Sequence, residues 1–219
     1  MYLDAYRKAA FDHLYDDFFY RRNNEFWKDK AMQKLPALLD STGMLACGED
    51  LGMIPATVPQ VMDDLRILSL EIQRMPKSIE ETFAHPANYP YLSVCTTSTH
   101  DMNPIRAWWE EDREVTNDFW HMILGNQGEA PYYCEPWICR QILDQHVWSP
   151  AMLTILPLQD WLSMDAQLRR EDPNTERINV PANSRHYWRY RMHLTLEQLE
   201  AADEFNKTLS DMIAASGRC

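Results

Sequence analysis

Short apolar runs alternate along the chain with longer stretches in which apolar residues recur at helical spacing. Within residues 1–40 the apolar side chains return every three or four positions, as at Phe11, Leu14, Tyr15 and Phe18, and this spacing predicts helices. Later stretches repeat the pattern with polar residues between the apolar ones. We therefore expect further helices at residues 55–65, 103–124 and 134–148.

Four apolar runs are short, as expected for strands that are covered on both faces. The run at 91–101 is the richest of them in β-branched residues, which favour strands. The four predicted strands lie at residues 43–52, 66–75, 91–101 and 151–160. Because strands and helices alternate, the sequence predicts an α/β fold with a parallel sheet built from crossover units.

Polar side chains stand at the ends of these predicted strands. In chain order the strands end in Glu49 and Asp50, in Gln73 and Arg74, in His100 and Asp101, and in Gln159 and Asp160. The active sites of parallel α/β proteins lie at the carboxyl ends of their strands. We therefore expect one face that gathers carboxylates, a histidine and an arginine, which suits acid and base chemistry on a hydroxyl-rich substrate. The alternative is that each acid only caps the helix that follows it.

Composition and net charge indicate which kinds of molecule the protein could bind. The 219 residues are 45% hydrophobic and 25% charged, which is ordinary for a soluble globular protein of one large domain or part of one. A net charge of -12 argues against nucleic acid or an anionic membrane as a partner, because phosphates would be repelled. The amino-terminal segment is too charged for a signal peptide, and we expect a cytoplasmic protein.

The five cysteines show no CxxC spacing, and their odd number argues against a disulfide framework. Cys47 and Cys95 lie inside apolar runs, where we expect small buried side chains. A metal site could be drawn from Cys134, Cys139 and His146, but the spacing of these residues fits none of the usual zinc patterns. We therefore expect reduced structural thiols and no metal or cofactor.

Several motifs together resemble one enzyme family. CGEDLGMIP, LEIQRMP, STHD and LPLQDWL occur in this order, and RAWWEED and HYWRYRMHLTLEQL extend the resemblance from about residue 14 to residue 213. They resemble the second half of the catalytic barrel in the 4-alpha-glucanotransferases of glycoside hydrolase family 77, above all the plant cytosolic type and its bacterial relatives. The resemblance implies a (β/α)8 barrel that transfers alpha-1,4-glucan segments between acceptors with retention of configuration.

The same resemblance implies roles for single residues. Glu49 matches the general acid/base of the family, Asp101 the aspartate that stabilises the transition state, and His100 a histidine that contacts the sugar. Arg74 and Gln159 are further candidates for binding sugar hydroxyls, with a purely structural hydrogen bond as the alternative. Asp50 is expected to point away from its neighbour Glu49 and to be structural.

One part of the family pattern is missing. A retaining mechanism needs a nucleophilic carboxylate, which the family carries in an Arg-Ile-Asp-His type motif on its fourth strand. Here the nearest string holds Asp12 and His13 in a helix-like stretch without the arginine. The resemblance therefore implies that residues 1–219 are the carboxy-terminal half of the catalytic domain, about strands five to eight, without the amino-terminal half.

The expected partners follow from this assignment. They are an alpha-glucan or maltooligosaccharide substrate, the missing half of the barrel, and further copies of the chain that pair through open sheet edges. Alone, the chain is expected to be inactive. Two other functions stay open: a glucan-binding or assembly module without catalysis, and an amylase-like hydrolase.

Overall fold

The computed structural model describes residues 3–52 and 54–218, and the chain divides into two compact units. The first unit contains the chain up to residue 70 together with residues 92–94. The second contains residues 71–91 and the chain from residue 95 onwards. The division passes through strands β1 (Ser69–Ile72) and β2 (Ser93–Thr96).

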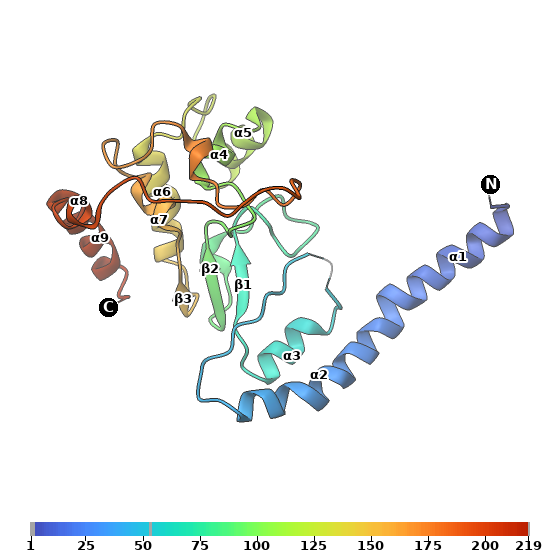
Figure 1. Ribbon diagram of the computed structural model, residues 1–219. Helices are drawn as coiled ribbons and strands as arrows, with labels where there is room; N and C mark the ends of the chain where they lie inside the picture. The colour runs from blue at the N-terminus through green and yellow to red at the C-terminus, as the bar shows by residue number, and fades with distance from the viewer. Residues whose placement is uncertain (1–2, 53, 219) are drawn as a thin grey trace. The chain divides into compact units, whose positions relative to one another are not determined.

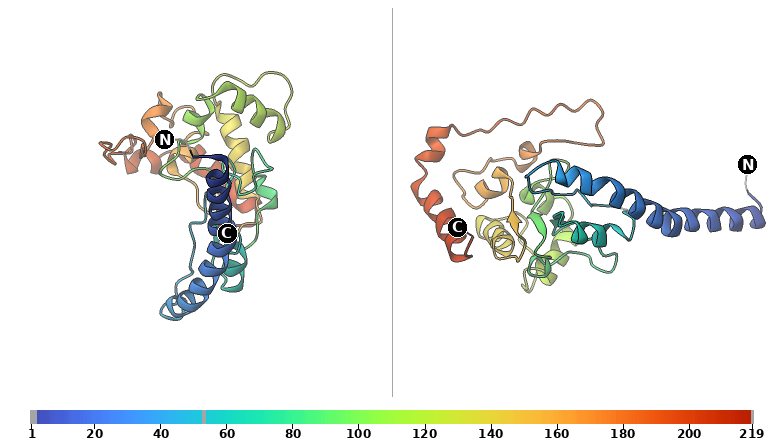
Figure 2. Two further views of the ribbon diagram at one scale, coloured as in Figure 1. Left: turned by 90° about the vertical axis from the view of Figure 1, so that its right-hand side faces the viewer. Right: turned by 90° about the horizontal axis from the view of Figure 1, so that it is seen from below.

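Three helical segments open the first unit and follow one another without a break. They are α1 (Ala5–Asp17), the π-helical turn η1 (Phe18–Arg22) and α2 (Asn23–Asp40), and Figures 1 and 2 show them as one long rod. The rod begins at Asp4, whose carboxylate accepts the backbone N–H of Arg7 at 2.9 Å and so caps the helix. The helical prediction for the first 40 residues is confirmed from Ala5 to Asp40, and residues 1–2 lie outside the described residues.

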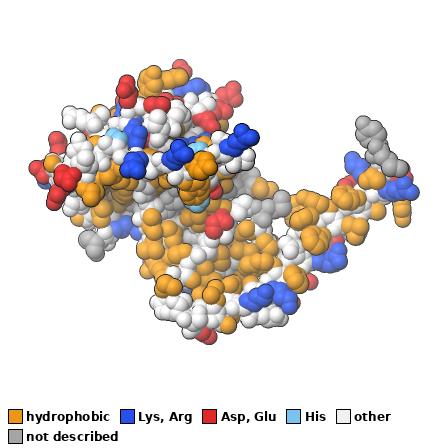
Figure 3. Space-filling model, viewed as in Figure 1, with side chains coloured by type: hydrophobic (Ala, Val, Ile, Leu, Met, Phe, Trp, Pro, Cys, Tyr) orange, Lys and Arg blue, Asp and Glu red, His pale blue; other side chains and the backbone are white. Residues whose placement is uncertain are grey.

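Large apolar side chains cover the rod from α1 to the start of α2. Figure 3 shows them as a succession of orange patches along the rod. In the described part of α1 no residue is buried. The exposed side chains include Tyr6, Phe11, Leu14, Tyr15, Phe18, Phe19, Tyr20 and Phe26. The apolar spacing thus predicted the helix correctly. The apolar side chains of α1, however, are not buried against the rest of this unit.

A small core forms where α3 (Val58–Asp64) packs in the first unit. Val58, Met62 and Ile67 are buried in it, and Leu35 and Leu39 of α2 pack against them. The helix predicted at residues 55–65 is therefore confirmed with shorter bounds.

The strand predicted at residues 43–52 is wrong in its extent, because it is reduced to one parallel bridge between Cys47 and Leu68. Glycine is a poor strand former, and Gly48 and Gly52 interrupt the run, the latter with a φ of 78°. Cys47 is exposed, so the expectation that it is buried is also wrong. Cys47 is exposed because the single bridge does not extend into a strand that the rest of the protein could cover.

The sheet has the strand order β1, β2, β3 (Leu153–Thr154) and is parallel. In the second unit, the N–H of Met152 donates to Tyr91 O at 2.8 Å and that of Ile155 to Cys95 O at 3.0 Å. The residue numbers of both partners rise together, as they do between parallel strands. The other three predicted strands are therefore confirmed, each shorter than expected.

Helices dominate the second unit. Its short 3₁₀ turns are η2 (Pro86–Asn88) and η3 (Pro173–Glu176). Its α-helices are α4 (Ile105–Trp109), α5 (Arg113–Met122), α6 (Pro136–Val147), α7 (Leu158–Leu162), α8 (Leu196–Glu200) and α9 (Asp203–Ala215).

The prediction of a single helix at residues 103–124 is wrong, because the chain starts a second helix at Asp112. The Asp112 carboxylate accepts the N–H groups of Glu114 and Val115 at 2.9 and 3.2 Å, which caps α5. The helix predicted at 134–148 is confirmed as α6.

An aromatic core supports the loop that follows β2. Trp109 and Phe119 are fully buried, with ring centroids 6.3 Å apart in an edge-to-face arrangement. Ile138 and Leu143 of α6 belong to the same cluster. Ile105, at the start of α4, is buried in this cluster too, so the core packs directly against the end of the loop. Cys95 is buried as expected.

Candidate active site

The loop between β2 and α4 presents His100 and Asp101, two of the predicted site residues, with about half of each side chain exposed (53% and 51%). The imidazole Nε2 of His100 lies 3.4 Å from Oδ2 of Asp101. The structure thus brings these two side chains together, with the carboxylate available to a ligand.

Two residues that the sequence reasoning missed hold this pair. Asn179 donates its side-chain N–H to Oδ1 of Asp101 at 2.6 Å and its backbone N–H to His100 O at 3.2 Å. The ring of Trp188 contacts that of His100, with centroids 4.8 Å apart and the ring planes tilted by 41°. Trp188 stands in the stretch HYWRYRMHLTLEQL of the family resemblance, whereas nothing in the spacing singled out Asn179.

Glu49 lies in the first unit and is exposed. Its Oε1 accepts the N–H of Leu51 at 2.9 Å, which orients the carboxylate without covering it. Its neighbour Asp50 is buried and accepts the N–H of Leu70 at 2.9 Å. The opposite environments of these adjacent acids confirm the prediction that Asp50 is structural.

Arg74 follows β1 in the second unit and lies mostly inside the protein. Its Nη2 donates to the carbonyls of Thr97 and Asn103, both at 2.8 Å, and its guanidinium stacks on the Trp108 ring at 4.9 Å. Burial lowers the pKa of Arg74 to about 10, and the negative charge of Asp160 opposes this change. Arg74 therefore keeps its positive charge at neutral pH.

Gln159 and Asp160 do not end a strand, because β3 stops at Thr154 and both residues lie in α7. This part of the strand prediction is wrong, since Pro157 ends the extended run and starts a helix. Both side chains are buried, and Gln159 donates to Glu176 O at 3.2 Å.

The buried carboxylate of Asp160 accepts three hydrogen bonds. They come from Thr97 Oγ1 at 2.5 Å, from Ser98 Oγ at 3.0 Å and from the N–H of Ile105 at 2.8 Å. Burial raises the pKa of Asp160, and these donors act against the rise. All three partners donate a hydrogen bond to the carboxylate oxygens, and an ionised carboxylate, which only accepts, satisfies them best. The contacts therefore favour the ionised form of Asp160.

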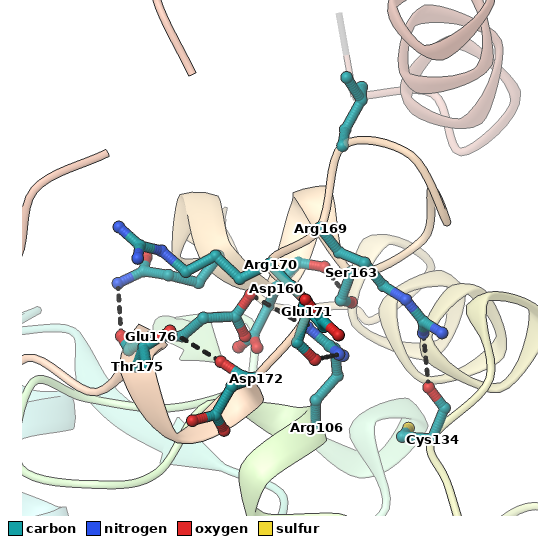
Figure 4. A network of polar contacts seen from close by, with 12 residues as sticks. Arg106, Cys134, Asp160, Ser163, Arg169, Arg170, Glu171, Asp172, Thr175 and Glu176 are labelled. Carbon is teal, nitrogen blue, oxygen red and sulfur yellow. Dashed lines mark hydrogen bonds and ion pairs between the residues drawn. The ribbon is translucent and has the colours of Figure 1, made fainter. Parts of the chain in front are cut away.

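A buried ion pair supports the segment that leads to Asn179. Nη1 of Arg106 lies 3.2 Å from Oε1 of Glu176, with only 6% and 2% of the two side chains exposed. Arg106 also donates to the carbonyls of Arg170 and Glu171 at 2.7 and 3.3 Å, and Figure 4 shows these groups gathered around its guanidinium. Burial raises the pKa of Glu176 to about 7 in spite of the nearby positive charge.

The described residues include no group of three or more histidine, cysteine or acidic side chains that could hold a metal ion. Cys134 and Cys139 are free thiols with sulfur atoms 3.4 Å apart. Among the helices of the described ranges, none is both long enough and apolar enough to cross a bilayer.

Known sequences and structures resemble the chain over most of its length. The family profile described as 4-alpha-glucanotransferase, of glycoside hydrolase family 77, matches residues 2–196. The chain is 40% identical over 216 residues to the 4-alpha-glucanotransferase DPE2 of Oryza sativa subsp. japonica, which covers 99% of this chain and 23% of that protein. It is 31% identical over 191 residues to a 4-alpha-glucanotransferase of Chlamydia muridarum, with 84% and 35% covered.

Among solved structures, the amylomaltase of Streptococcus agalactiae in complex with acarbose matches with a TM-score of 0.61 and 19% identity, covering 84% of this chain and 34% of that one. The amylomaltase of Corynebacterium glutamicum matches with a TM-score of 0.53 and 16% identity, covering 81% and 29%. These likenesses concern the fold. The chain thus spans between about a quarter and a third of the length of these four proteins.

Proposed function

This chain belongs to glycoside hydrolase family 77, the 4-alpha-glucanotransferases, and on that premise we propose that residues 1–219 form the carboxy-terminal half of a catalytic (β/α)8 domain. The parallel order β1, β2, β3 and the bridge at Cys47 fit about strands five to eight of such a barrel. The similarity to amylomaltase folds over 84% of the chain supports the same assignment.

The proposed reaction is transfer of alpha-1,4-glucan segments between glucans or maltooligosaccharides by a retaining double displacement. In this reaction Glu49 protonates the departing glycosidic oxygen and later takes the proton of the incoming acceptor hydroxyl. Asp101 stabilises the positive charge that develops on the sugar ring, and His100 contacts the same sugar. The nucleophile comes from the part of the enzyme that precedes this chain.

The observation that carries this proposal is the placement of Asp101. Its carboxylate is half exposed, stands beside His100 and is oriented by the 2.6 Å hydrogen bond from Asn179. Such a fixed and accessible negative charge is what stabilisation of an oxocarbenium-like transition state needs. The exposed carboxylate of Glu49 is likewise free to exchange a proton with a ligand.

Arg74 and Gln159 were predicted to bind sugar hydroxyls, and that role stays a prediction for both. Arg74 already uses Nη2 and Nε on backbone carbonyls, and Gln159 uses its amide N–H on Glu176 O. These contacts favour support of the site over direct contact with the substrate.

The direct test mixes the purified chain with a separately produced amino-terminal half of a family 77 enzyme and supplies maltose or maltotriose. We expect no transfer by the chain alone and transfer by the mixture. Glu49→Gln in the mixture is expected to lower turnover by about 10²–10⁴-fold, the usual contribution of a general acid/base. Transfer by the isolated chain, lost in Glu49→Gln, would overturn the half-domain proposal.

The products separate the remaining alternatives. Transfer yields both longer and shorter oligosaccharides, whereas an amylase-like hydrolase releases reducing ends to water without longer products. A glucan-binding module would bind acarbose or maltooligosaccharides without forming either. As the compartment of the enzyme we propose the cytoplasm.

A further inference from the structure

The loop that carries His100 and Asp101 is fastened at both of its ends by the same two charged side chains. Asp160 accepts hydrogen bonds from Thr97 and Ser98 where the loop begins, and from the N–H of Ile105 where it ends. One carboxylate therefore bridges points of the chain that are seven and eight residues apart in sequence, and it defines their separation.

Arg74 makes a second bridge across the same loop. Its guanidinium donates to Thr97 O at the beginning, through both Nε at 3.2 Å and Nη2 at 2.8 Å, and to Asn103 O near the end at 2.8 Å. The planar guanidinium is also held by stacking on Trp108. Its Nη1 is buried and has no hydrogen-bond partner.

Between the two fastened ends, the loop makes few bonds of its own. The N–H of Met102 donates to Thr99 O at 3.2 Å and that of Asp101 to Thr99 Oγ1 at 3.3 Å. These are local turns, which do not by themselves fix the direction of the loop relative to the sheet. That direction therefore depends on contacts from outside the loop. These are the bonds of Asn179 to His100 and Asp101 and the bridges that Arg74 and Asp160 make across the two ends of the loop.

We propose that Arg74 and Asp160 are positioning residues, a clamp that fixes both ends of residues 97–105 and thereby aims Asp101 at the reacting sugar. The inference rests on the proposed function, because it gives the clamp a role in the same reaction. Neither residue touches the substrate in this assignment. Loss of the clamp is expected to act on the chemical step more than on binding, since near-perfect alignment of the carboxylate counts most in the transition state.

The test compares Arg74→Met with Arg74→Lys and with a matched control, Arg113→Met. Arg113 also donates to two backbone carbonyls, Ala130 O at 2.6 Å and Pro131 O at 3.0 Å, and its guanidinium also lies over an aromatic ring. It fastens a different loop. Removing it therefore costs similar contacts without touching the clamp.

Two readouts are measured on these variants. The first is amide hydrogen exchange of residues 99–103 in the isolated chain, which needs no activity. The second is kcat and KM for maltotriose in the enzyme assembled with its amino-terminal half. In Arg74→Met we expect exchange in the loop to rise about tenfold or more and kcat to fall about tenfold or more, with KM within about twofold. Arg74→Lys should restore part of both, and Arg113→Met should change neither.

Other results would overturn the clamp. If Arg74→Met raises KM and leaves hydrogen exchange in the loop unchanged, Arg74 binds the sugar directly. If the variant changes neither the exchange nor kcat, Arg74 does not position the loop. If Arg74→Met does not fold, Thr97→Val takes its place, because it deletes only the 2.5 Å bond to Asp160. If the assembled parent enzyme is inactive, the proposed function fails, whereas exchange in the loop still decides whether Arg74 and Asp160 hold it.

Discussion

Glu176 predicts a pH dependence of stability that can be isolated by one substitution. Its carboxyl group is almost completely buried beside Arg106, and burial raises its pKa from an ordinary 4.5 to about 7. An acid whose pKa is raised by folding holds its proton more tightly in the folded state. Its contribution to stability is therefore complete below pH 4.5 and is lost as the pH rises to about 7.

The size of the effect follows from the two pKa values. Each tenfold change in proton affinity corresponds to about 1.4 kcal/mol, so a rise from 4.5 to about 7 gives at most about 3 kcal/mol. Glu176→Gln removes the titration but keeps the oxygen that accepts the hydrogen bond from Arg106. Relative to the variant, the parent chain is therefore expected to lose up to about 3 kcal/mol of unfolding free energy between pH 4.5 and pH 7.5.

Urea unfolding followed by tryptophan fluorescence, repeated at half-unit steps across that range, measures the difference between parent and variant. The exposed Glu80→Gln serves as a control and should follow the parent at every pH. Acids that do not interact with Glu176 titrate alike in both proteins and cancel in the difference. A difference that stays constant within about 0.5 kcal/mol would refute the reasoning, because a glutamate whose pKa is raised by folding must give such a slope.

Three further predictions concern other parts of the chain. Asp112→Ala removes the cap of α5 and should lower the unfolding free energy of the chain by about 1 kcal/mol in the same urea assay. Asp101→Asn in the assembled enzyme should lower kcat by at least about a hundredfold with little change in KM, since the charge acts in the transition state; equal losses in binding would contradict this. Light scattering of the isolated chain should show self-association through an outer strand such as β3, and a strict monomer at high concentration would count against it.

The α/β class and most elements could be predicted from the sequence, because local spacing decides them. Periodicity identified the rod of α1 and α2, and β-branched residues identified β2. The break at Asp112 was missed, because apolar residues recur at helical spacing through residues 103–124 and the capping contact forms only in the folded chain. The reduction of residues 43–52 to a single bridge was missed because pairing depends on a partner strand that spacing does not reveal.

The candidate site was predictable only in part, for a similar reason. The family motifs identified His100 and Asp101, and the structure places them together. Asn179 lies 78 residues beyond Asp101, and its contact with that carboxylate arises from tertiary folding alone. Arg74 was predicted to bind sugar hydroxyls because it stands at the end of a predicted strand. In the structure its side chain lies inside the protein and donates its hydrogen bonds to the backbone of the loop.

Two of the polar pairs at the ends of the predicted strands differ in their environment, because the backbone around them differs. Glu49 and Asp50 lie in a part of the chain that belongs to no helix, and their environments are opposite. Glu49 is exposed, whereas Asp50 is buried and accepts the N–H of Leu70. Gln159 and Asp160 stand in α7, where neighbours are about 100° apart, and both can be buried. Of these two pairs, only the one outside a helix therefore presents an exposed carboxylate that could act on a ligand. Where a helix begins at once, the pair serves the protein interior, and this is why Asp160 supports the loop of Asp101.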